Sequence, residues 1–169
     1  GGFFRFSLYK TQNLSQMQKP GKLIYFREGL SANVSVQKRG KHLFLKINGK
    51  VDASSSGDSP AQLSLAALPL LYHPNAKDIA VVGWGSGMTA GAALLFPIRR
   101  LDALELEPAV VEGARHFAKW NYQPERDKRL QLIYNDARNH FATTKRRYDV
   151  IISQPSNPWL SGIANLFTV

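Results

Sequence analysis

The stretch from Ile79 to Gly91 constrains this chain most, because a short apolar run ends there in alternating glycines and continues in small residues. Residues 79–82 are mostly β-branched and uninterrupted, which predicts a strand buried on both faces. Gly83, Gly85 and Gly87 allow backbone torsions that a Cβ forbids, and the amino end of the helix that follows faces the turn. A strand, a glycine turn and a helix predict a nucleotide-binding turn, although the pattern also occurs as a structural turn.

The spacing of these glycines narrows the choice of ligand. The pattern is G-x-G-x-G, and Met88 stands where the dinucleotide fingerprint has its third Gly or Ala. An adenosyl ligand without a pyrophosphate is therefore favoured over NAD.

Strands and helices alternate around the turn. The expected strands are 79–82, 101–106, 130–134 and 149–153, and the expected helices are 61–72, 88–95, 108–120 and 139–144. This order predicts a doubly wound, Rossmann-like α/β domain over residues 59–169. We expect the sheet to be cut short after its fourth strand, in a chain that is a fragment, and the open edge to favour a homodimer.

The first third of the chain has a different periodicity. Residues 23–26, 33–37 and 43–47 are separated by short polar turns, which predicts a small antiparallel β domain. Residues 53–60 are predicted as a loop, with Ser59 as the N-cap of the next helix and Pro60 as its first residue. We therefore divide the chain into an N-terminal β domain over 1–58 and an α/β domain over 59–169.

Ligands in doubly wound sheets lie beyond the carboxyl ends of the strands. Glu105 ends the second strand 22 residues after Gly83, close to the offset of about 20 at which a carboxylate accepts hydrogen bonds from ribose hydroxyls. Glu107 stands at the start of a helix, where its negative charge can stabilise the helix dipole or, equally well, contact a ligand. Asp136 follows the third strand, where it can accept from the exocyclic amine of adenine or cap the next helix. Together, these strand ends predict an adenosyl pocket.

Composition argues against several classes of function. The net charge is +10, yet the basic residues are dispersed, with no recognition helix or RNA-binding signature, so we expect a solvated basic surface and no nucleic acid. The chain has no cysteine, and its four histidines share no ligand spacing, so no metal is expected. No apolar run approaches the ~18 residues of a membrane span.

Four segments, taken in order, resemble the spermidine synthase (polyamine aminopropyltransferase) family. They are I-A-V-V-G-W-G-S-G, L-E-L-E-P, N-D-A-R and Y-D-V-I-I-S-Q-P-S-N-P. The likeness covers residues 23–167 and is especially close to a bacterial branch fused to transmembrane helices. The resemblance implies a methyltransferase-type fold and an adenosyl substrate, S-adenosylmethionine or its decarboxylated form, with a polyamine as the second partner. It also implies a cytoplasmic location, at the membrane face if such helices are attached.

The resemblance also assigns residues to the ligand. Those predicted to bind the adenosyl compound are Gln62, Gly83, Gly85, Ser86, Gly87, Glu105, Asp136 and Ala137. The candidates for catalysis are Gln154 and Asn157, which stand where the family has two aspartates that bind the polyamine and take its proton. An amide has no useful basicity, and the loss of general-base help costs roughly 10²- to 10⁴-fold in rate.

A further departure lies in the glycine turn. The family carries an acid there that favours the decarboxylated substrate, and Ser86 stands at that position, so discrimination against ordinary S-adenosylmethionine should relax. These departures weaken the case for aminopropyl transfer. One alternative is an S-adenosylmethionine-dependent N-methyltransferase, because residues 157–159 resemble an amine-binding Asn-Pro-Pro-aromatic loop. The other is a non-catalytic domain that senses an adenosyl metabolite or a polyamine.

Overall fold

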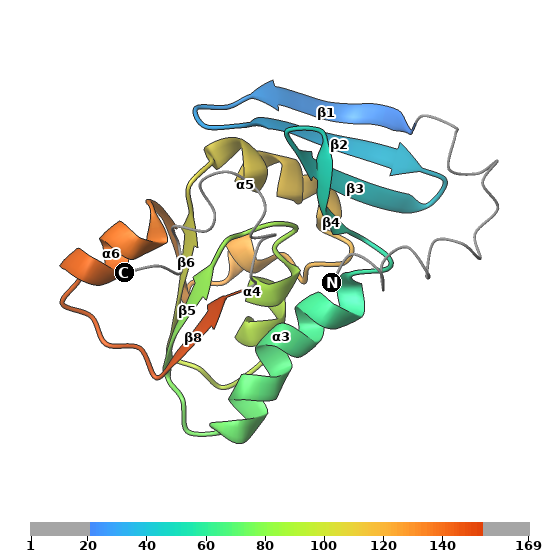
Figure 1. Ribbon diagram of the computed structural model, residues 1–169. Helices are drawn as coiled ribbons and strands as arrows, with labels where there is room; N and C mark the ends of the chain where they lie inside the picture. The colour runs from blue at the N-terminus through green and yellow to red at the C-terminus, as the bar shows by residue number, and fades with distance from the viewer. Residues whose placement is uncertain (1–20, 154–169) are drawn as a thin grey trace, which may run out of the picture.

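The computed structural model describes residues 21–153, which form an antiparallel sheet beside a parallel sheet that is flanked by helices (Figure 1). The antiparallel sheet has the order β1-β2-β3-β4, made of β1 (Lys22–Glu28), β2 (Asn33–Arg39), β3 (His42–Ile47) and β4 (Lys50–Ser54). Alternate residues of β2 and β3 are buried, namely Val34, Val36, Leu43 and Leu45. The predicted β meander is present, with one strand more than its pattern indicates.

That fourth strand corrects the prediction of a loop from residue 53. Ala53 pairs with Leu45 and Ser54 pairs with Phe44. Serine and alanine have little preference for strands, but the pairing partner on β3 supplies the backbone hydrogen bonds that decide the conformation.

The parallel sheet has the order β7-β6-β5-β8. Its strands are β5 (Asp78–Val82), β6 (Arg100–Glu105), β7 (Leu130–Tyr134) and β8 (Val150–Ser153), and every neighbouring pair is parallel. Each lies within one residue of the predicted strand, so the α/β fold class is confirmed.

Helices cover both faces of this sheet. They are α3 (Ser59–Tyr72), α4 (Met88–Leu94), α5 (Pro108–Ala114) and α6 (Ala137–Thr143). Ile79 and Val81 pack into the larger apolar core, while Ala80 packs with residues of α6 in a second cluster on the opposite face. Figure 1 accordingly shows α6 on the other side of β5 from α3 and α4.

The main differences from the predicted helix boundaries lie at the start of α3, the end of α5 and the start of α6. Ser59 is the first residue of α3 and not its N-cap, because Asp58 occupies that position. The helix predicted over 108–120 ends at Ala114 and continues as a 3-10 turn, and the Asn121 side chain donates to the Ala114 carbonyl at 3.4 Å. The α6 helix begins at Ala137, two residues earlier than predicted, because Asp136 caps it.

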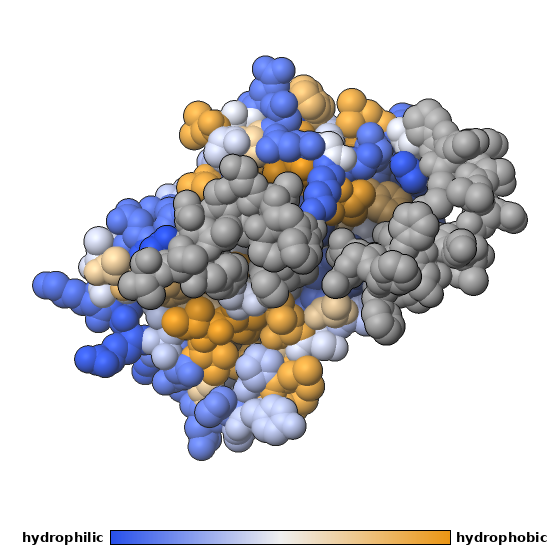
Figure 2. Space-filling model, viewed as in Figure 1, coloured by the Kyte–Doolittle hydropathy of each residue, from blue (hydrophilic) through white to orange (hydrophobic). Residues whose placement is uncertain are grey.

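Apolar surface gathers in the region of β8 and α3 (Figure 2). The exposed large apolar residues of these two elements are Leu68, Leu71, Tyr72 and Ile151. The strand β8 forms this edge of the parallel sheet, and its pairing with a second copy of the chain stays a prediction. Within residues 21–153, none of the helices has the length and apolar character needed to span a membrane, and attachment to membrane helices likewise stays a prediction.

Candidate functional site

The sheet brings three of the predicted strand ends together. Val82 is paired with Leu104, and Glu105 is paired with Tyr134, two residues before Asp136. Hydrogen bonds continue this alignment past the strands, because the Gly83 amide donates to the Leu104 carbonyl at 2.8 Å. The glycine turn, Glu105 and Asp136 therefore lie along one edge of the sheet.

The glycine turn has an open side and a packed side. Gly83, Gly85 and Gly87 have φ values of +83°, +54° and +80°, a region that favours glycine. Among residues 21–153, a Cβ at Gly83 would meet nothing within 4 Å, whereas one at Gly87 would lie 3.1 Å from Asn121 Nδ2. A ligand can therefore approach the main chain at Gly83, while Gly87 is required by the packing behind the turn.

Glu105 is fixed by the main chain of two neighbouring loops. The Trp84 amide donates to its Oε2 at 2.8 Å, and the Glu107 amide donates to its Oε1 at 3.0 Å. Burial raises the pKa of the Glu105 carboxyl, an effect that these backbone hydrogen bonds oppose in part and that the charge of Asp52 reinforces. Each carboxylate oxygen has a further lone pair, so the group can accept from two hydroxyls.

Asp136 caps the helix that follows it. Its Oδ1 accepts from the Asn139 amide at 3.0 Å, and Ala137 behind it is buried as the first residue of α6. The capping role of Asp136 is thus confirmed, and its contact with adenine stays a prediction.

Gln62 reaches the glycine turn from α3. The Ser86 hydroxyl donates to Gln62 Oε1, and the Thr89 hydroxyl donates to the Gln62 carbonyl at 3.1 Å. Gln62 and Ser86 are both buried. Within the part of the chain that the structure describes, Gln62 Nε2 is buried without a hydrogen-bond partner. An unpaired buried donor costs about 1–3 kcal/mol, which an acceptor on a ligand would offset.

Asp52 lies beside the glycine turn, a position that the sequence does not indicate. It projects from β4 of the N-terminal sheet, and its Oδ2 would lie 4.0 Å from a Cβ at Gly85. The side chain keeps an exposed surface, but loss of surrounding water raises its pKa, with Asp58 adding to the shift and Lys50 opposing it. Because β4 is not predicted, no sequence pattern places Asp52 over the turn.

Glu107 and Asn121 make hydrogen bonds that hold neighbouring loops in place. Glu107 is the N-cap of α5, and its carboxylate also accepts from the amide and the hydroxyl of Ser31. Burial disfavours its charge, but these hydrogen bonds outweigh burial and lower its pKa. Asn121 is buried, and its Nδ2 donates to the Ser86 carbonyl at 3.0 Å, which steadies the glycine turn.

Two other predictions concern catalysis and metals. Gln154 and Asn157 lie outside the described residues. Between residues 21 and 153, no group of three or more His, Asp or Glu side chains is arranged to hold a metal ion.

Comparison with curated proteins identifies relatives in polyamine metabolism. The chain is 22% identical to polyamine aminopropyltransferase 2 of Aquifex aeolicus, over 99% of this chain and 34% of the relative. It is 28% identical to polyamine aminopropyltransferase of Bacillus subtilis, over 80% of this chain and 48% of the relative. It is also 29% identical to putrescine N-methyltransferase 2 of Nicotiana tabacum, over 68% of this chain and 33% of the relative. The chain thus spans less than half the length of each.

The fold and the family agree with these relatives. A spermidine synthase solved in complex with the transition state analogue AdoDATO has a TM-score of 0.74 at 21% identity, covering 82% of this chain and 48% of that one. The spermidine synthase from Thermotoga maritima has a TM-score of 0.72 at 21% identity, covering 78% and 47%. The family model for the spermine/spermidine synthase domain matches residues 60–169. This chain therefore belongs to the spermine/spermidine synthase family.

Proposed function

We propose that this spermidine synthase-like domain binds S-adenosylmethionine or its decarboxylated form at the carboxyl ends of β5, β6 and β7, and transfers an alkyl group from the sulfonium to an amine. The observation that carries the proposal is the Glu105 carboxylate, held at the end of β6 by the amides of Trp84 and Glu107. The aminopropyltransferases among the relatives support the reaction class.

The ligand would be held at three points. Glu105 accepts hydrogen bonds from the ribose hydroxyls, and Asp136 accepts from the exocyclic amine of adenine. The main chain at Gly83, where a side chain would meet no described residue within 4 Å, receives the sulfur end of the ligand.

Asp52 would hold the ammonium group of the ligand's side chain. Its carboxylate lies close to Gly85, and its charge raises the pKa of Glu105, so the two carboxylates repel each other. A bound cation relieves that repulsion. Ser86 is neutral and bonded to Gln62, so Asp52 supplies the negative charge that Ser86 does not.

The transfer step needs little covalent chemistry from the protein. The lone pair of the amine attacks the carbon next to sulfur, the carbon–sulfur bond breaks, and its electron pair stays on sulfur as a neutral thioether. The amine nitrogen then gives up one proton. Gln154 and Asn157 are amides and cannot take that proton, so it passes to water, and the rate should rise with pH as more of the amine becomes neutral.

Calorimetry with S-adenosylmethionine, its decarboxylated form and methylthioadenosine tests binding, and mass spectrometry after addition of putrescine or spermidine tests transfer. We expect Asp52→Asn to weaken binding of the decarboxylated compound about tenfold. Methylthioadenosine, which lacks the ammonium, should bind both proteins equally. Failure of all three ligands to bind would contradict the proposal, and binding without any transfer would favour a sensing domain.

N-methyl transfer is the second candidate. Two features favour it. Ser86 is neutral and donates to Gln62 Oε1, and the buried Gln62 Nε2 has no hydrogen-bond partner among residues 21–153. Such an unpaired donor suits the carboxylate of S-adenosylmethionine. The mass of the product distinguishes the two reactions, since a methylated amine supports this candidate and an aminopropylated amine excludes it.

A further inference from the structure

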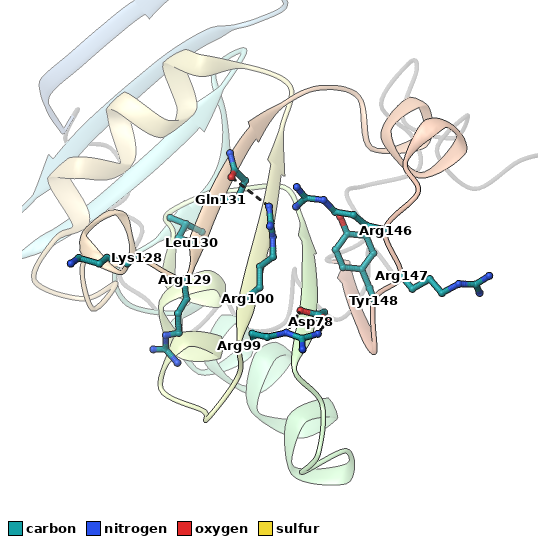
Figure 3. A pocket seen from close by; sticks show the side chains of 10 residues that line it. All are labelled: Asp78, Arg99, Arg100, Lys128, Arg129, Leu130, Gln131, Arg146, Arg147 and Tyr148. Atoms are coloured by element: carbon teal, nitrogen blue, oxygen red, sulfur yellow. Dashed lines mark hydrogen bonds and ion pairs between the residues drawn. The ribbon is translucent and has the colours of Figure 1, made fainter.

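A basic cavity lies at the opposite end of the parallel sheet from the adenosyl site. Its volume is about 520 Å³, within the range of small-molecule pockets. It opens near the first residues of β5, β6 and β7, on the face that carries α6 (Figure 3). The basic residues that line it are Arg99, Arg100, Lys128, Arg129, Arg146 and Arg147.

Two of these arginines share one buried carboxylate. Arg100 Nε donates to Asp102 Oδ1 at 2.6 Å, and Arg146 Nη1 donates to Asp102 Oδ2 at 2.7 Å. Asp102 is 0% exposed, and the Tyr148 hydroxyl also donates to its Oδ2, at 2.8 Å. One negative charge therefore holds two guanidinium groups, here called the arginine pair, and leaves a net positive charge.

The other cations of the cavity are directed elsewhere. Arg99 forms an ion pair with Asp78. Arg129 donates to a carboxylate and to three main-chain carbonyls, which occupies its guanidinium. Arg147 and Lys128 point away from the arginine pair in Figure 3. The arginine pair is therefore the part of the cavity best placed to bind an anion.

The arginine pair keeps donors for a ligand. Each guanidinium spends one nitrogen on Asp102, and within residues 21–153 Arg100 Nη2 makes only a long contact of 3.4 Å to Gln131 Oε1. The side chains of Arg100 and Arg146 are 33% and 45% exposed, so solutes can reach them. Guanidinium forks match the oxygens of phosphate, and a fixed pair of them binds a phosphate group more specifically than dispersed lysines do.

We propose that the arginine pair is a binding site for a phosphate group carried by a small molecule or a headgroup, and that Asp102 positions both guanidiniums for it. A concave site of this size suits a compact phosphate ester or a diphosphate. This site does not depend on the adenosyl ligand.

The matched variants are Arg146→Gln and Arg147→Gln, which remove the same charge from adjacent positions. Calorimetry of the full chain with pyrophosphate, at physiological salt, should show binding that Arg146→Gln weakens about tenfold or more, because charged hydrogen bonds are lost. Arg147→Gln should change the affinity less than about twofold. No binding of pyrophosphate, or equal losses in the two variants, would overturn the proposal.

Thermal unfolding tells whether Arg146→Gln still folds. If it does not fold, Arg146→Lys takes its place, since lysine keeps a positive charge beside Asp102 but lacks the paired donors of a guanidinium group. Arg146→Lys should weaken pyrophosphate binding several-fold, and an unchanged affinity would contradict the proposal.

Two further probes separate the sources of phosphate. Flotation with vesicles that contain phosphatidic acid, blocked by pyrophosphate and by Arg146→Gln but not by Arg147→Gln, assigns the phosphate to a lipid headgroup. Binding of pyrophosphate without flotation assigns it to a soluble molecule. Binding of an RNA oligonucleotide that both variants weaken equally indicates diffuse electrostatics and counts against the site.

Discussion

The two ends of the parallel sheet carry opposite charge. The carboxyl ends of the strands face Glu105, Asp136 and Asp52, whereas the arginine pair lies near the amino ends. The strands between them have only four to six residues. One short sheet thus separates a surface that favours cations from one that favours anions.

Helix direction accounts for this division. Helices that follow parallel strands begin at the carboxyl ends of those strands, so their free amides gather there and bind carboxylates. Glu107 and Asp136 both accept from such amides. At the other end, Arg129 donates to the carbonyls of Leu94, the last residue of α4, and of Phe96 and Ile98 just after it. The opposite charges therefore follow from the topology, and the predictions below test whether the two ends act independently.

The largest effect is expected for Glu105→Ala. The substitution removes the acceptor for the ribose hydroxyls, and we expect binding of methylthioadenosine to weaken by about 2–3 kcal/mol, or roughly 30- to 150-fold. Calorimetry with pyrophosphate should give the same affinity as before, since that site lies at the other end of the sheet. Glu125→Ala, on an exposed 3-10 turn, is the control. A loss of pyrophosphate binding in Glu105→Ala would show that the ends are coupled.

Asp102→Asn should have the next largest effect, on stability. It leaves the guanidiniums of Arg100 and Arg146 beside each other without their shared counter-charge. Because both arginines are partly exposed, we expect a loss of about 2 kcal/mol in the free energy of unfolding, less than for a fully buried pair. Urea denaturation measures it. Asp149→Asn, at an exposed acid that accepts from two amides, should cost less, and an equal cost would argue against a special role for Asp102.

A smaller effect should distinguish the two sides of the glycine turn. Gly83→Ala and Gly87→Ala both force a Cβ onto a residue with positive φ, which costs about 1–2 kcal/mol. Gly87→Ala adds contact with Asn121 and Trp84, so it should lower the melting temperature more. Gly83→Ala should lower methylthioadenosine affinity more, because its Cβ enters the open space. The reverse order in either measurement would contradict the assignment of the open side.

The strands, and the position of Glu105 at the end of one of them, could be predicted because their signals are local. A buried parallel strand is a continuous apolar run, and a carboxylate at a fixed offset after a glycine turn needs no knowledge of partners. Asp52 and β4 could not be predicted in this way, since β4 depends on its pairing with β3. Similarly, Asp102 looks like an isolated acid in an apolar strand, and its partner Arg146 lies 44 residues away in sequence.

The smallest effect is a pH dependence of the adenosyl site. Burial raises the pKa of Glu105 above its ordinary value of 4.5, so its carboxylate is protonated at a higher pH than an exposed glutamate. As the pH falls through that raised pKa, affinity for methylthioadenosine should fall, by roughly two- to tenfold over one to two pH units.

Stability of the unliganded chain should move the other way, because the cost of burying the charge is present above the raised pKa and is relieved as the pH falls. Glu105→Gln, which cannot ionise, should flatten both profiles in calorimetry and urea denaturation between pH 7.5 and 5. If affinity for methylthioadenosine still falls with pH in that variant, the group whose titration weakens binding is not Glu105.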